Sequence, residues 1–95
     1  SKVRIIESWT FDGCKSLEIV NLPEDLIKIG DGAFRDCVSL ERINVYDECD
    51  YIADNAFDGC DKLTICGMKG SYAEQYAKKH NIPFEKLDTT IQSVN

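Results

Sequence analysis

One spacing recurs along the first two thirds of the chain: the same residue types return every 23 positions. Four sets show it, namely Phe11, Phe34 and Phe57; Cys14, Cys37 and Cys60; Leu17, Leu40 and Leu63; and Ile6, Ile29 and Ile52. The register divides this part into residues 3–25, 26–48 and about 49–68. A period of 23 is too short for a packed helix pair, which needs about 33 residues or more. It fits one coil of a solenoid that buries its apolar side against the coil before.

Each coil contains a predicted strand in which apolar and polar residues alternate. Val20 and Leu22 flank Asn21, and Asn44 has the same place between two aliphatic residues of the next repeat. A period of two turns the aliphatic side chains inward and the asparagines outward. We therefore expect neighbouring coils to pair these strands in parallel, about 4.8 Å apart.

A return segment follows each predicted strand, with the sequences Ile29-Gly-Asp-Gly-Ala-Phe34 and Ile52-Ala-Asp-Asn-Ala-Phe57. Asp residues are good helix N-caps, so Asp31 and Asp54 are expected to start a single helical turn. The phenylalanine that ends each sequence is expected to stack on its equivalents as an inner aromatic ladder.

The segment after the repeats predicts a helix and a strand. Ser71 and Glu74 form a capping box at the start of the helix. Asn81 suits a left-handed C-cap, because asparagine tolerates positive φ. Residues 83–87 are expected to form a final strand that covers the sheet edge, and residues 88–95 a frayed tail. The apolar side of the helix is made by Tyr72, Ala73, Tyr76 and Ala77.

The repeat unit Leu40-x-x-Ile43-x-Val45-x-x-x-Cys49-x-x-Ile52-x-x-x-Ala56-Phe57-x-x-Cys60 resembles the BspA-type leucine-rich repeat. The resemblance covers residues 3–68, and residues 67–84 resemble the C-terminal cap of such arrays. It implies an α/β leucine-rich-repeat solenoid of about three 23-residue coils, with short parallel strands and a helix–strand cap at 69–87. Residues 1–95 then form one domain. Nothing resembles an N-terminal cap, so we expect a piece of a longer array.

Composition and motifs argue against several classes of function. The net charge of −6 disfavours nucleic acid, which needs clustered Lys and Arg. No run of about 18 apolar residues is present to span a membrane. His80 is the single histidine and stands among lysines, so neither Ser-His-Asp nor Cys-His catalysis is supported. The chain is predicted to be no enzyme and to hold no cofactor.

The five cysteines are interpreted as buried thiols rather than metal ligands. A straight ladder of three does not converge on a tetrahedral site, and thiols pack as small hydrophobes. We expect zero or one reactive thiol, with Cys66 as the candidate. The acidic residues lack the order of a Ca²⁺ loop and are interpreted as a solvated face, so no metal is expected.

The candidate partner-binding residues include the outward strand positions Ile19, Asn21, Arg42, Asn44 and Tyr46. They lie in rows, with Ile19 over Arg42, Asn21 over Asn44, and Tyr46 beneath Pro23. Solenoids use such surfaces for partners, and Arg and Tyr carry much interface energy. The other interpretation is an ordinary solvated strand face.

Trp9 completes the candidate partner-binding set, although it breaks the repeat. Its equivalents are Gly32 and Asn55. It either covers the edge of a coil or anchors a partner, since tryptophan is enriched at interface hot spots.

The resemblance implies a protein-binding module of a bacterial surface or secreted protein, adhering to host matrix proteins and located outside the cell. Two alternatives stay open. The repeats could be a spacer or stalk end with no ligand of their own. They could also be a non-catalytic domain attached to an enzyme.

Overall fold

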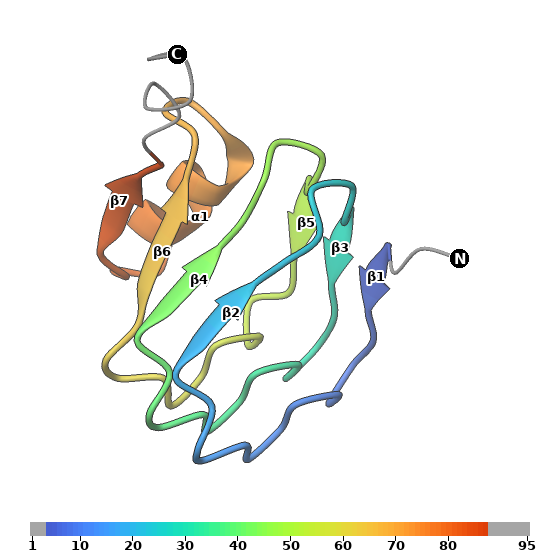
Figure 1. Cartoon of the computed structure of the whole chain (residues 1–95), viewed down its shortest axis with the longest axis vertical. Helices are drawn as coiled ribbons and strands as arrows, with labels where there is room; N and C mark the ends of the chain where they lie inside the picture. The colour runs from blue at the N-terminus through green and yellow to red at the C-terminus, as the bar shows by residue number, and fades with distance from the viewer. Residues whose placement is uncertain (1–3, 88–95) are drawn as a thin grey trace, which may run out of the picture.

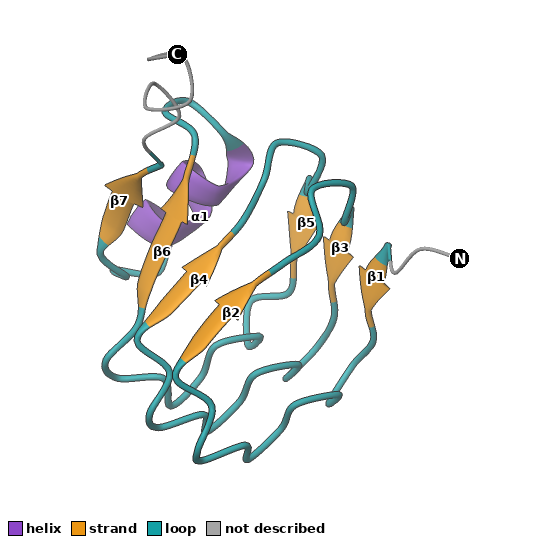
Figure 2. Ribbon diagram, viewed as in Figure 1, coloured by secondary structure: helices purple, strands orange, loops and turns teal. Residues whose placement is uncertain are grey.

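The fold is a solenoid with two parallel sheets, seen in a computed structural model that describes residues 4–87. The predicted tail at 88–95 and the first residues of the first repeat lie outside these residues. One sheet has the order β1-β3-β5 and the other β2-β4-β6-β7 (Figures 1 and 2). The elements are β1 (Ile5–Ile6), β2 (Ile19–Asn21), β3 (Lys28–Ile29), β4 (Arg42–Asn44), β5 (Tyr51–Ile52), β6 (Thr64–Gly67), α1 (Tyr72–Lys79) and β7 (Phe84–Lys86).

Each coil contributes one strand to each sheet. The first, second and third coils carry β1 and β2, β3 and β4, and β5 and β6 respectively, and β7 adds the strand of a fourth turn. Strands β2 and β4 pair in parallel with Val20 opposite Ile43, a separation of one 23-residue period. Leu22, Ile43 and Val45 are buried. The predicted parallel solenoid is confirmed.

The sheet formed by β1, β3 and β5 was not predicted from the sequence. Its strands are two residues long, and each has one exposed and one buried residue, as in Lys28 and Ile29. Two residues are too few to show an alternating pattern. The only signal for it in the sequence was the recurrence of Ile6, Ile29 and Ile52 every 23 residues, because these are the buried residues of the three strands.

The return segment is a series of turns rather than a helix. The N–H of Phe34 donates to the carbonyl of Ala56 at 2.9 Å, and the N–H of Asp36 donates to Asp58 at 2.7 Å. The backbone N–H of the intervening Arg35 instead donates to the carbonyl of Gly32 in its own coil, at 3.1 Å. Every second N–H therefore bonds to the next coil, as in a parallel strand. The N–H groups between them bond within their own coil, as in a turn.

The prediction that Asp31 and Asp54 start a helical turn is therefore wrong. An α-helix needs an uninterrupted series of bonds to the carbonyl four residues back. In the second coil the neighbouring coil takes alternate donors, so that series cannot form after Asp31. After Asp54 the backbone hydrogen bonds reach back only three residues, as from the N–H of Asp58 to the carbonyl of Asn55, so that segment is also a series of turns. The only α-helix in residues 4–87 is α1 of the cap.

The predicted aromatic ladder runs through the core. The rings of Phe11 and Phe34 stack with centroids 5.2 Å apart and planes 12° apart, and Phe34 and Phe57 follow at 5.4 Å and 8°. Tyr76 of α1 meets Phe57 edge-on at 6.1 Å. The cap thus ends the ladder, which extends from the first coil to the helix.

The cap forms as predicted, with one difference at its start. Ser71 Oγ accepts a hydrogen bond from the N–H of Glu74 at 3.3 Å. Glu74 Oε1 accepts one from Gly70 at 2.6 Å, one residue earlier than in the usual capping box. That backbone hydrogen bond lowers the pKa of Glu74. Asn81 has the predicted left-handed conformation, with φ of 58°, and β7 covers the edge of β6.

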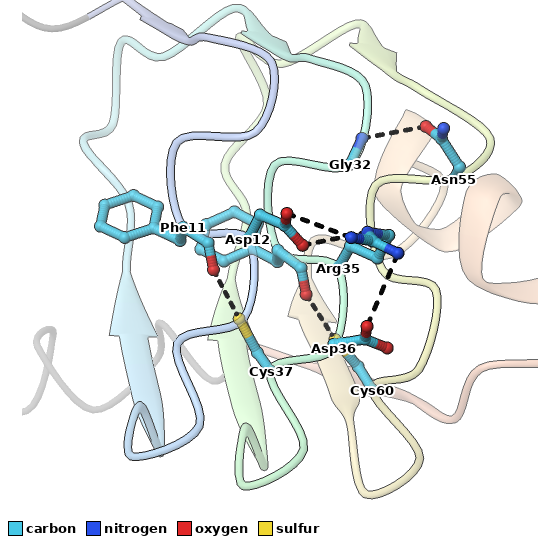
Figure 3. A network of polar contacts seen from close by, with 9 residues as sticks. Phe11, Asp12, Gly32, Arg35, Asp36, Cys37, Asn55 and Cys60 are labelled. Atoms are coloured by element: carbon cyan, nitrogen blue, oxygen red, sulfur yellow. Dashed lines mark hydrogen bonds and ion pairs between the residues drawn. The ribbon is translucent and has the colours of Figure 1, made fainter.

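Two members of the cysteine ladder, Cys37 and Cys60, are buried, and their thiols bond to the coil before. Cys37 Sγ donates to the carbonyl of Phe11 at 3.1 Å, and Cys60 Sγ donates to that of Phe34 at 2.9 Å (Figure 3). Burial raises the pKa of Cys37, and it raises that of Cys60 to about 11. These thiols are therefore protonated at neutral pH and are poor nucleophiles.

The structure corrects the expectation for Cys66. Its side chain is completely buried, and burial raises its pKa. Cys14 is the partly exposed thiol instead. The sequence favoured Cys66 because it ends the last repeat strand, but β7 and α1 cover that strand.

Candidate functional site

Five of the six predicted partner-binding residues come together at the outer side of the sheet that contains β2 and β4. Ile19 lies beside Arg42, and Asn21 lies beside Asn44, each pair in register across two parallel strands. Tyr46 follows two residues after Asn44 and reaches back to Asn21. We call Ile19, Asn21, Arg42, Asn44 and Tyr46 the strand face.

Hydrogen bonds between side chains hold one end of the strand face in place. Asn21 Oδ1 accepts from Tyr46 Oη at 2.9 Å and from Asn44 Nδ2 at 3.2 Å. Two donors from the second coil, Asn44 and Tyr46, thus share one acceptor from the first coil. Their rotamers are restricted before any partner arrives, which reduces the entropy lost on binding.

The other end of the strand face combines an exposed aliphatic group with a charge. Ile19 is 64% exposed, the most exposed large apolar side chain in residues 4–87. Arg42 next to it donates from Nη2 to Glu85 Oε1 of β7 at 2.6 Å. That hydrogen bond raises the pKa of Arg42. A shallow hollow at this end is lined by Ile19, Glu41, Arg42, Lys62 and Thr64.

Glu85 is a part of this surface that the sequence did not reveal. It lies on the cap strand, 43 residues after Arg42. No motif links the two positions, and only the parallel pairing of β7 with β6 brings them together. The cap therefore completes the strand face as well as closing the core.

Trp9 does not join the strand face. It lies in the turn segment after β1, where its N–H donates to the carbonyl of Asp31 at 2.8 Å. Its indole packs over Gly32 of the next coil. The ring also lies near the Arg35 guanidinium, 5.7 Å from the ring centroid. These contacts are all in the turn segments, so Trp9 marks a second surface.

Within residues 4–87, no group of three or more His, Cys, Asp or Glu side chains is placed to hold a metal ion. A cavity of about 280 Å³ lies between the third coil and the cap. His80 Nε2 lies there 3.3 Å from Asp54 Oδ1. The one thiol that lines this cavity, Cys60, has its pKa raised to about 11 by burial.

Comparison with protein families agrees with the coil geometry. The model for the BspA type leucine rich repeat region, with six copies, matches residues 1–93. The chain belongs to the BspA-type leucine-rich-repeat family. No curated protein and no solved structure matches it. The family assignment therefore rests on the repeat itself.

Membership of the BspA-type family indicates a protein-interaction repeat module. The leucine-rich-repeat solenoid is generally a non-enzymatic scaffold, and the family is typically found at the cell surface or secreted. Among the described residues of this BspA-type chain, no helix is both long and apolar enough to cross a bilayer.

Proposed function

We propose that this BspA-type domain binds another protein through its strand face and serves adhesion to host matrix proteins at a bacterial surface. The observation that carries the proposal is Ile19, an aliphatic side chain that is 64% exposed on a strand between a charge and a polar network. A partner that covers Ile19 would remove its apolar surface from water, which favours binding. The neighbouring Arg42 and Tyr46 are residue types that contribute strongly at interfaces.

The domain is proposed to act by contact alone, without catalysis. Most described thiols are buried, and Nε2 of the single histidine lies 3.3 Å from Asp54 Oδ1 beside the cap. A small, preorganised face of two or three coils supports modest affinity, and several copies in an array would raise it through avidity.

A matched pair of variants tests the proposal. Ile19→Asp places a charge at one end of the strand face, whereas Val38→Asp places the same charge on an aliphatic residue outside that face that is 45% exposed. Binding to a panel of immobilised matrix proteins is measured for both by surface plasmon resonance. We expect Ile19→Asp to weaken binding about tenfold or more and Val38→Asp to leave it unchanged.

Two results would count against adhesion by the strand face. Equal binding by both variants would place the contact elsewhere. Absence of binding by the wild type, presented as a multivalent display to allow for avidity, would favour the spacer interpretation.

A further inference from the structure

The backbone of Trp9 is in a conformation that tryptophan rarely adopts. Its φ is 66°, in the left-handed region. The other residues with positive φ in 4–87 are all Gly, Asp or Asn, the types that tolerate it. The equivalent position of the next coil holds Gly32, with φ of 56°. The first two coils thus share a backbone conformation that suits glycine, and a bulky aromatic residue in it costs free energy.

Packing recovers only a part of that cost. One edge of the indole covers Gly32, yet 51% of Trp9 remains exposed. A tryptophan that served the core would bury most of its surface, as the stacked phenylalanines do. Strained residues that persist without an evident structural gain are found at binding sites.

The ring is also held in one place. The backbone N–H of Trp9 donates to the carbonyl of Asp31 and fixes the main chain there, and the edge of the indole rests on Gly32. Arg35 donates from Nε and Nη2 to Asp12, at 3.0 and 3.2 Å (Figure 3). These hydrogen bonds keep its guanidinium beside the indole of Trp9. An exposed aromatic side chain that is already fixed loses little entropy when a partner binds.

The charge around Trp9 indicates the chemistry of the partner. Glu7 lies two residues before Trp9 in the chain, and the backbone carbonyl of Asp31 accepts from the backbone N–H of Trp9. Both acidic residues are exposed. The nearby guanidinium of Arg35 forms ion pairs with Asp12 and with Asp36, whose Oδ2 lies 3.7 Å from Arg35 Nη1. The surroundings are therefore acidic in balance, and the indole is the best ring for attracting a cation. A basic segment complements both features.

We propose that Trp9, with Glu7 and Asp31, forms an anchor for an arginine-bearing segment of a partner protein. We call these three residues the Trp9 anchor. It rests on the proposed protein-binding function but lies apart from the strand face. The guanidinium would stack on the exposed part of the indole while the carboxylates attract its charge.

The single tryptophan makes the test direct, because its fluorescence reports on this position alone. The domain is titrated with tetra-arginine, and with tetra-citrulline as the uncharged isostere. We expect a saturable change of emission with tetra-arginine only, and a loss of that change at about 500 mM salt because exposed charges are screened. The same response to citrulline, or none to arginine, would overturn the proposal.

Two carboxylate variants test whether the binding is specific. Asp31→Asn is expected to weaken tetra-arginine binding about threefold or more, whereas Asp47→Asn, an exposed carboxylate in the segment between β4 and β5, is expected to have no effect. Equal weakening by both would indicate attraction to the whole acidic surface and would contradict the anchor.

Trp9→Asn separates binding from folding. Asparagine suits the left-handed backbone, so we expect a folded domain of equal or higher stability that no longer shows amide shifts at the turn segment with tetra-arginine. A loss of stability like that of a buried aromatic residue would assign Trp9 to covering the second coil and overturn the proposal. The short tetra-arginine peptide tests the Trp9 anchor and not the strand face. If it does not bind, the strand-face proposal is therefore unaffected.

Discussion

The indole of Trp9 occupies the space that a side chain at position 32 would need. A Cβ atom built on Gly32 would overlap Cζ3 and Cε3 of Trp9. The two residues are one 23-residue period apart, and both have positive φ. The indole of Trp9 in the first coil thus has room only because Gly32 of the second coil has no side chain.

Gly32→Ala is expected to destabilise the domain by about 2–4 kcal/mol. About 1 kcal/mol comes from placing a Cβ at positive φ, and the rest from the clash with the indole. Gly13→Ala is the matched control, since Gly13 has φ of 74° with no atom within 4 Å of the added Cβ. Urea unfolding measures both variants.

The clash can be tested by relieving it. Trp9→Asn combined with Gly32→Ala is expected to recover most of the difference between Gly32→Ala and Gly13→Ala, because the indole is gone. Equal destabilisation by the two single glycine variants would show that the Trp9 contact has no energetic effect.

Cys37→Ser is expected to cost about 1 kcal/mol. The sequence alone predicts about 1–3 kcal/mol for burying a hydroxyl. The carbonyl of Phe11, which accepts from the thiol at 3.1 Å, is available to accept from the hydroxyl and keeps the cost at the low end. Cys37→Ala leaves that carbonyl without the donor and is expected to cost more. The reverse order in urea unfolding would contradict a role for the hydrogen bond.

Thiol reactivity is expected to separate Cys14 from the other four cysteines. Cys14 is partly exposed, whereas Cys37, Cys49, Cys60 and Cys66 are buried. A disulfide reagent applied to the native domain should modify one thiol quickly and the others only as fast as the protein unfolds. Cys14→Ala should remove the fast phase. A fast phase that survives in this variant would show that a buried thiol opens to solvent.

Stability is expected to fall as the pH rises from 9 to 11. The pKa of Cys60 is raised from 9.0 to about 11 in the folded state. Below pH 9 the Cys60 thiol is protonated in both the folded and the unfolded state, so its contribution to the free energy of unfolding is fully present. Above it, the unfolded chain loses the proton first, which favours unfolding by up to about 3 kcal/mol.

Urea midpoints at neutral pH and at pH near 9 and 11, with a reducing agent present, measure this loss. Cys60→Ala serves as the control, because it should flatten the decline even though it lowers stability at neutral pH. An unchanged decline in that variant would assign the effect to other groups, such as Tyr76, whose pKa is also raised by burial.

The sequence predicted the paired residues of the strand face but not the contribution of the cap to it. The period of 23 placed Asn21 beside Asn44 and Ile19 beside Arg42, and the structure has both pairs. It did not reveal that Glu85 would reach Arg42, because β7 lies outside the repeat. Trp9 was recognised as unusual, but its conformation and its dependence on Gly32 were not predicted.

The sequence by itself determined the coil length, the parallel register and the ladder of Phe11, Phe34 and Phe57. A residue that recurs at one position of every coil must meet its own copies when the coils stack. Only the tertiary structure decided the second sheet, the turns in place of a helical turn, and the surroundings of Trp9 and Cys66. These features depend on which hydrogen-bond donors and which space the next coil or the cap takes, and no local pattern carries that information.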